Sequence, residues 1–146
     1  MAENSFLLQV KDLKKYFYRG RMFSVDKKPI RAVDGISFSI RKGETLGLVG
    51  ESGCGKTTAG KSVLRLIEPT SGQILFKDQD ILQLDREAMR RVRPRMQFIF
   101  QDPYESLNPR MKVGEIVGEG LEVHRLARGM EKTRRVSEIL EKVGLH

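Results

Sequence analysis

The chain has 146 residues, a length that suits one domain with a buried core. Hydrophobic residues make up 39% and charged residues 32%, which excludes a disordered chain. No apolar stretch has the length of a transmembrane helix. The single cysteine excludes an internal disulfide, and the first residues lack the pattern of a signal peptide, so we expect a cytoplasmic protein.

The formal net charge is +8, and the basic residues gather in two clusters, at 11–31 and 86–95. Such clusters can meet nucleic acid, anionic lipid or polyphosphate, or they can simply be solvated faces. No aromatic residue lies between the arginines of the second cluster, which leaves base stacking without support. We favour solvated faces and expect no nucleic-acid partner.

Short strands dominate the first hundred residues. Residues 6–10 are expected to form the first strand, and residues 18–28 read as a polar, basic loop. Ile36, Phe38 and Ile40 alternate with serines, which is the pattern of a half-buried strand. Apolar runs predict further strands at 45–49, 73–76 and 96–100, with a turn at 69–72 and a short helix at 84–93 closed by a proline.

Helices are expected after residue 103. Apolar residues recur at helical spacing from 113 to 121, although three glycines weaken that helix. The last segment has one apolar stripe, two i,i+4 ion pairs (Glu131–Arg135 and Glu138–Lys142) and Gly144 as a C-terminal cap. The order predicts an α/β fold, with a strand-rich core at 1–102 and the beginning of a helical subdomain at 103–146.

Residues 50–57, Gly-Glu-Ser-Gly-Cys-Gly-Lys-Thr, fill the phosphate-loop pattern G-x-x-x-x-G-K-[ST]. Glycines let the backbone approach a ligand closely, so that successive N–H groups form a nest for phosphate oxygens at the start of a helix. Lys56 adds a charge for the β- and γ-phosphates, and the hydroxyl of Thr57 can ligate Mg²⁺. Thr58 is a further candidate phosphate contact. The alternative is a glycine-rich turn that binds nothing.

Cys54 occupies a free position of the pattern, so no catalytic role follows. We hypothesise that alkylation of this thiol blocks nucleotide binding sterically. His124 and His146 lie far apart, without the ligand spacing of a metal site.

Three features together resemble the ATP-binding subunit of an ABC transporter. They are the loop with its preceding segment Ala-Val-Asp-Gly-Ile-Ser-Phe at 32–38, the segment Leu-Lys-Lys-Tyr-Phe at 13–17, and Gln101 at the end of an apolar run. The extension at 101–111 and the basic insertion at 19–31 are similar to the oligopeptide/dipeptide importer branch. The resemblance implies an α/β P-loop NTPase fold of the ABC type, of which this chain looks like the N-terminal half.

The resemblance also implies roles for single residues. Phe17 would stack on adenine, with Tyr16 as the alternative because the register of an aromatic pair is open. Gln101 would reach toward Mg²⁺ or the attacking water, so it is a candidate catalytic and metal residue beside Lys56 and Thr57. The nucleotide contacts it implies are Ser52, Gly53, Cys54, Gly55, Lys56, Thr57 and Thr58.

The family's signature sequence, its acidic strand with the catalytic glutamate and its switch histidine do not occur in these 146 residues. Because phosphoryl transfer needs several groups acting at once, we expect this stretch to bind MgATP but to hydrolyse it little alone. It also lacks the strand expected beside 46–49, which leaves backbone groups unpaired, so we expect it to be marginally folded in isolation. The resemblance implies transmembrane permease subunits and a second ATP-binding subunit as partners, at the inner face of the cell membrane. The alternatives are an ABC-type ATPase working on nucleic acid, a P-loop kinase and a non-catalytic nucleotide-binding module.

Overall fold

The computed structural model describes residues 6–18, 28–102 and 104–145. Its contacts divide the chain into two compact units, Met1–Met89 and Arg90–His146, each of which is described by itself. The border falls within helix α2 (Arg86–Val92). The expected division into a core of residues 1–102 and a helical subdomain of residues 103–146 stays a prediction.

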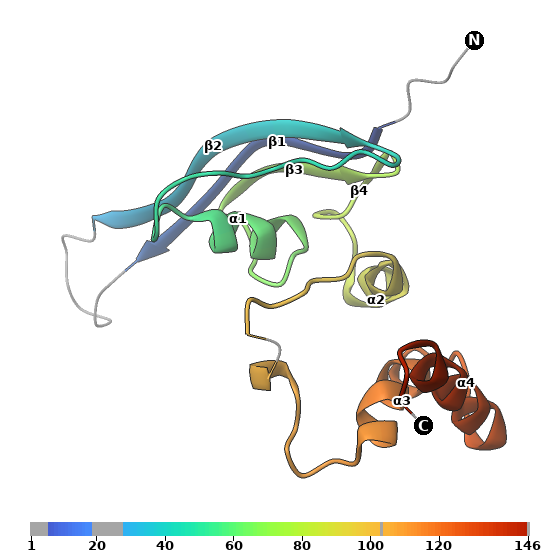
Figure 1. Cartoon of the computed structure of the whole chain (residues 1–146). Coiled ribbons are helices and arrows are strands. Elements are labelled where there is room, and N and C mark those ends of the chain that lie inside the picture. Colours follow the sequence, from blue (N-terminus) through green and yellow to red (C-terminus); the bar gives the residue numbers. More distant parts are fainter. Residues whose placement is uncertain (1–5, 19–27, 103, 146) are drawn as a thin grey trace. The chain divides into compact units, whose positions relative to one another are not determined.

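The first unit is built on a four-stranded antiparallel sheet in the order β2-β1-β3-β4 (Figure 1). The strands are β1 (Phe6–Tyr18), β2 (Pro29–Arg41), β3 (Ser71–Phe76) and β4 (Gln79–Asp80). The strands predicted at 6–10, 36–40 and 73–76 are confirmed, and the first two are longer than expected. Most of the predicted loop at 18–28 lies outside the described residues.

A bulge in β1 lets the strand bury two residues that lie three apart. Val10 and Leu13 are 1% and 0% exposed, although an odd spacing in a regular strand places side chains on opposite faces. The register with β2 shifts between these two residues, and Asp12 has a φ of 46° there. The Asp12 N–H donates to Ser37 Oγ at 2.8 Å, so the bulged backbone keeps a partner.

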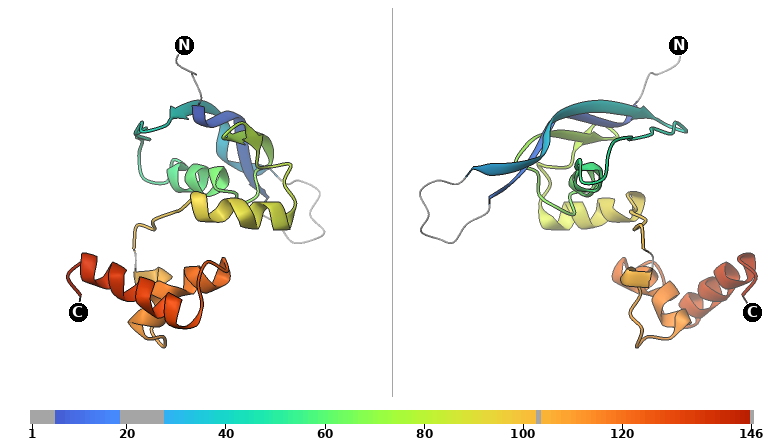
Figure 2. Two further views of the ribbon diagram at one scale, coloured as in Figure 1. Left: turned by 90° about the vertical axis from the view of Figure 1, so that its right-hand side faces the viewer. Right: turned by 60° about the vertical axis from the view of Figure 1, so that its left-hand side comes forward.

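Helix α1 (Lys56–Val63) lies along one face of the sheet and closes the core of the first unit (Figures 1 and 2). Its residues Ala59 and Val63 are buried, as are Val33 of β2 and Ile74 of β3. Apolar burial of this kind is the main favourable contribution to folding. The start of α1, where the phosphate-loop pattern ends, is therefore attached to the sheet.

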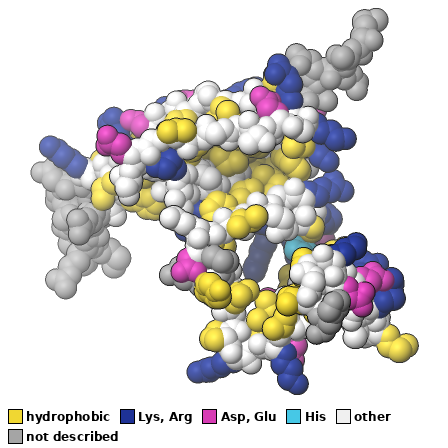
Figure 3. Space-filling model, in the orientation of Figure 1, with side chains coloured by type: hydrophobic (Ala, Val, Ile, Leu, Met, Phe, Trp, Pro, Cys, Tyr) yellow, Lys and Arg dark blue, Asp and Glu magenta, His cyan; other side chains and the backbone are white. Residues whose placement is uncertain are grey.

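The strands predicted at 45–49 and 96–100 are wrong. Neither segment belongs to the four-stranded sheet of the described residues, and both follow irregular paths. Val49 is 95% exposed and Ile99 is 91% exposed. Figure 3 shows hydrophobic side chains at the surface beneath the sheet of the first unit. An apolar run becomes a strand only when a neighbour accepts and donates its backbone hydrogen bonds, and no described segment does so here.

The second unit is helical. The helix expected at 84–93 is confirmed as α2, which crosses the border between the units. In the second unit it is followed by the 3-10 turn η1 (Arg93–Arg95), which contains the proline. A second 3-10 turn, η2 (Tyr104–Ser106), precedes α3 (Val113–Val123) and α4 (Gly129–Lys142), which confirm the two expected helices. Among the described residues no helix is long and apolar enough to cross a bilayer.

Helices α3 and α4 pack against each other at a glycine. A Cβ on Gly118 would lie 3.2 Å from Val136 Cγ2 and 2.3 Å from Lys132 Cε, so glycine permits the close approach. Val136 is buried at this contact. Gly118 lowers the helix propensity of α3, but the packing of α3 against α4 depends on it.

Ion pairs and a C-terminal cap support α4. Glu131 accepts from Arg134 and, as predicted, from Arg135. These two arginines hold the pKa of Glu131 at about 2, below its ordinary value of 4.5. Glu138 pairs with Arg134 in the described part of the chain, and not with Lys142 as predicted. Gly144 follows the helix with a φ of 78° and donates to the Glu141 carbonyl at 3.0 Å, which confirms the predicted cap.

Candidate nucleotide-binding site

The phosphate-loop residues 50–57 lead directly into α1, and glycine is required at the junction. Gly55 caps the helix with φ 100° and ψ 2°, a left-handed conformation. A Cβ at this position would lie 2.0 Å from the carbonyl oxygen of Ala32 in β2. Residues that have a side chain rarely adopt this backbone conformation, and a Cβ here would collide with the carbonyl oxygen. The loop can therefore approach β2 this closely only with glycine at position 55.

Lys56 curls back over the loop that precedes it. Its Nζ donates to the carbonyl oxygens of Gly50 and Glu51, each at 2.7 Å, and lies 3.5 Å from Cys54 Sγ. An ammonium has three protons, so two are used by carbonyls and the third points to a weak acceptor. An anionic oxygen is a far better acceptor than a thiol, and phosphate can take that third position without breaking the loop.

The candidate phosphate contacts on both sides of Lys56 are at least partly exposed. Thr57 is exposed in the first turn of α1 and Thr58 is half-buried, while Ser52 and Gly53 are exposed in the loop. The first turn of α1 carries no acidic residue, so the partial positive charge of the helix N-terminus is not neutralised there. The donor set fits a polyphosphate, and the exposed Thr57 hydroxyl fits a Mg²⁺ ligand.

The structure separates the two aromatic candidates near the end of β1. The hydroxyl of Tyr16 donates to the Asp34 carboxylate in β2, and its N–H donates to Thr70 Oγ1 at 2.9 Å. Phe17 is 40% exposed, with the Lys15 ammonium 4.9 Å from its ring centroid. Phe17 is therefore the more exposed of the two rings, and its role as the base contact stays a prediction.

The hydrogen bond between Tyr16 and Asp34 perturbs both groups. It raises the pKa of the Tyr16 hydroxyl, and it lowers the pKa of the Asp34 carboxyl, to which Arg31 contributes at 3.3 Å. The shifts favour the protonated Tyr16 hydroxyl and the ionised Asp34 carboxylate, which are the forms that make this hydrogen bond. The bond links this part of β1 to β2.

Phe17 and the phosphate loop attach to the same stretch of β2. Phe17 pairs with Ile30 in the sheet, and Gly55 contacts Ala32. Ile30 and Ala32 are two residues apart, which is about 7 Å along a strand. The structure thus brings the candidate base contact and the candidate phosphate contacts together, although they lie some forty residues apart in sequence.

Gln101 lies in the second unit. It is exposed in a bend, and the next residue, Asp102, accepts the Tyr104 N–H on its side chain at 2.9 Å, which shapes the start of η2. The role of Gln101 at Mg²⁺ or water stays a prediction. Among the described residues no cluster of histidine, cysteine and carboxylate side chains could hold a metal.

One residue of the site was missed by the sequence reasoning. Ala32 places the loop through its backbone carbonyl, and a carbonyl is present at every position of a chain. Nothing in the local pattern marks it, because the contact joins segments 23 residues apart.

The sequence profile described as ABC transporter matches residues 33–146, which include the loop, Gln101 and the two C-terminal helices. The chain belongs to the ABC transporter family. The fold prediction of an ABC-type α/β ATPase is thereby confirmed, and a solved structure agrees with it. The dimeric ATP-binding cassette MJ0796, in a post-hydrolysis state bound to ADP and Pi, has a TM-score of 0.76, is 26% identical, and is matched over 95% of this chain and 58% of that chain.

Two similar family members come from Bacillus subtilis (strain 168). The oligopeptide transport ATP-binding protein AppF is 49% identical over 99% of this chain. The oligopeptide transport ATP-binding protein OppF is 49% identical over 96% of this chain. In both cases the chain spans 45% of the length of the relative.

Proposed function

We propose that the chain is the nucleotide-binding part of an ATPase subunit that energises an ABC-type importer of oligopeptides. The observation that carries the proposal is the closed phosphate loop, with Lys56 held by the carbonyls of Gly50 and Glu51 at the start of a helix attached to β2. The names of the relatives support the transport of oligopeptides.

In the proposed site each part of the nucleotide meets a different element. Phe17 stacks on the adenine, and the N–H groups of residues 52–58 and the Lys56 ammonium bind the phosphates. Thr57 and Gln101 are the residues that would hold Mg²⁺. When bound, Mg²⁺ neutralises charge on the β- and γ-phosphate oxygens. Gln101 would also orient water and respond to the state of the nucleotide.

The proposed assembly contains transmembrane permease subunits and a second ATP-binding subunit, at the inner face of the membrane. The dimeric state of the similar cassette supports a second ATPase subunit. The groups needed for hydrolysis beyond the phosphate loop and Gln101 would come from the rest of the subunit and from its partner. The solute itself would be selected by other subunits of the importer.

The test compares Lys56→Ala with wild type in the full-length protein, using MgATP binding by calorimetry and uptake of a labelled oligopeptide by cells. We expect binding to weaken at least about tenfold and uptake to stop, because a charge-assisted contact is lost and the loop loses its internal support. The exposed Lys42→Ala is the matched control and should change neither. Unchanged ATP binding in Lys56→Ala would overturn the nucleotide site, and loss of binding with normal peptide uptake would overturn the transport assignment.

A further inference from the structure

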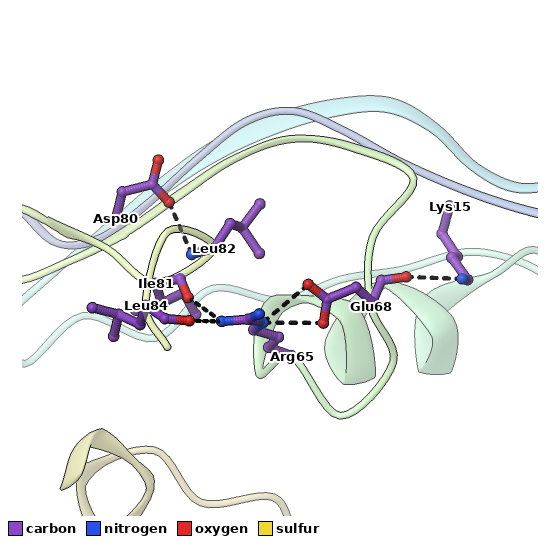
Figure 4. A network of polar contacts seen from close by, with 7 residues as sticks. All are labelled: Lys15, Arg65, Glu68, Asp80, Ile81, Leu82 and Leu84. Atoms are coloured by element: carbon purple, nitrogen blue, oxygen red, sulfur yellow. Dashed lines mark hydrogen bonds and ion pairs between the residues drawn. The ribbon is translucent and has the colours of Figure 1, made fainter. Parts of the chain in front are cut away.

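A chain of polar contacts runs from the loop after β4 to the ammonium of Lys15 (Figure 4). Arg65 donates through one nitrogen to the carbonyls of Ile81 at 2.9 Å and Leu84 at 2.8 Å, and its Nε binds the Glu68 carboxylate at 3.0 Å. The backbone carbonyl of Glu68 accepts from Lys15 Nζ at 2.8 Å. The end of the α1 segment therefore holds a lysine of β1 in one place.

The same ammonium lies over the ring of Phe17. The distance from Lys15 Nζ to the ring centroid is 4.9 Å, within the range of a cation–π contact. The two residues lie two apart in β1, across a shift in its register with β2, and the hydroxyl of Tyr16 between them bonds Asp34 of β2. Phe17 still exposes 40% of its surface.

We infer that Lys15 is a positioning residue for the base of the bound nucleotide: it holds one face of the Phe17 ring and leaves the opposite face to adenine. The inference rests on the proposed function. A cation anchored by Glu68 restricts the rotation of Phe17, so the ring has less conformational freedom to lose when the base stacks on it. The phosphate loop makes no described contact with Lys15, so the effect concerns the base and not the phosphates.

The strength of an exposed cation–π contact sets the expected effect. It corresponds to about a two- to fivefold change in affinity. Lys15→Met keeps the length of the side chain and removes the charge. Lys15→Arg keeps a cation and a donor. Lys11→Met, in an exposed residue of the same strand, is the matched control. Phe17→Leu removes the ring.

The experiment measures the affinity of the full-length protein for MgATP and for magnesium tripolyphosphate, which has the phosphates without the base. We expect Lys15→Met to weaken MgATP about two- to fivefold, to leave tripolyphosphate unchanged, and to have no effect when Phe17→Leu is already present. Lys15→Arg should restore most of the ATP affinity, and Lys11→Met should resemble wild type.

Three results would overturn the inference: unchanged ATP affinity in Lys15→Met, an equal loss for both ligands, or additive effects of Lys15→Met and Phe17→Leu. An equal loss would mean that Lys15 supports the fold through Glu68 and not the base through Phe17. If Lys15→Met does not fold, Lys15→Gln, which also removes the charge, takes its place in the same comparison. A wild-type protein that binds neither ligand would instead refute the proposed function.

Discussion

Alanine at Gly55 should disrupt the phosphate loop more strongly than alanine at the other loop glycines. The new Cβ would lie 2.0 Å from the Ala32 carbonyl oxygen, whereas ordinary contacts begin at 3.4 Å. Backbone on both sides makes the contact stiff, so the loop or β2 must move by about 1.4 Å, the difference between these distances. Overpacking of this size costs about 1–3 kcal/mol, and the left-handed conformation costs an alanine about 1–2 kcal/mol more. We expect a loss of about 3 kcal/mol.

Two other glycines provide graded controls. Gly53 has a φ of 82° with open space around its missing Cβ, so Gly53→Ala should lose only the conformational part, about 1–2 kcal/mol. Gly47 has open space and no positive φ, so Gly47→Ala should be close to neutral. The order expected for the loss of stability is therefore Gly55, then Gly53, then Gly47.

The assay is urea unfolding of the full-length variants followed by circular dichroism, together with MgATP affinity. The slope of the transition should stay the same, so that a shift in midpoint reports stability. Gly55→Ala should also abolish MgATP binding, because the loop can no longer close on β2. If Gly55→Ala were as mild as Gly53→Ala in both measurements, the contact with Ala32 would not determine the loop's conformation.

Three further predictions concern other parts of the chain. Arg65→Met should lower the free energy of unfolding by about 2 kcal/mol in urea melts, because two carbonyls lose a charged donor; a loss below about 0.5 kcal/mol would contradict it. Arg134 and Arg135 hold the pKa of Glu131 at about 2, below 4.5, so their ion pairs stabilise α4 above pH 4.5 and this contribution disappears as the pH falls toward 2. Glu131→Gln should therefore reduce the loss of helicity between pH 4.5 and 2, measured by circular dichroism. An unchanged loss of helicity in this variant would argue against the ion pairs. Alkylation of the exposed Cys54, 3.5 Å from Lys56 Nζ, should block MgATP binding and be slowed by MgATP; labelled protein that binds normally would refute the steric argument.

The sequence by itself predicted the elements whose signals are local. The stripe of α4, its Glu131–Arg135 pair and its Gly144 cap involve residues at most four positions apart, so a short window contains the whole interaction. The phosphate loop is also local, since its donors are consecutive. The same reasoning failed at 45–49 and 96–100, because a strand depends on a partner that no local window contains.

Only the tertiary structure decided which of the two aromatic residues is the more exposed and where the loop is attached. The sequence favoured Phe17 and kept Tyr16 as an alternative; in the structure Asp34, from another strand, accepts from the hydroxyl of Tyr16, and the Phe17 ring is exposed. The contact of Gly55 with Ala32 joins two segments that chain spacing does not relate. The chemistry of the phosphate loop follows from the order of its residues, whereas its position beside a ring and a lysine follows from the pairing of β1 with β2.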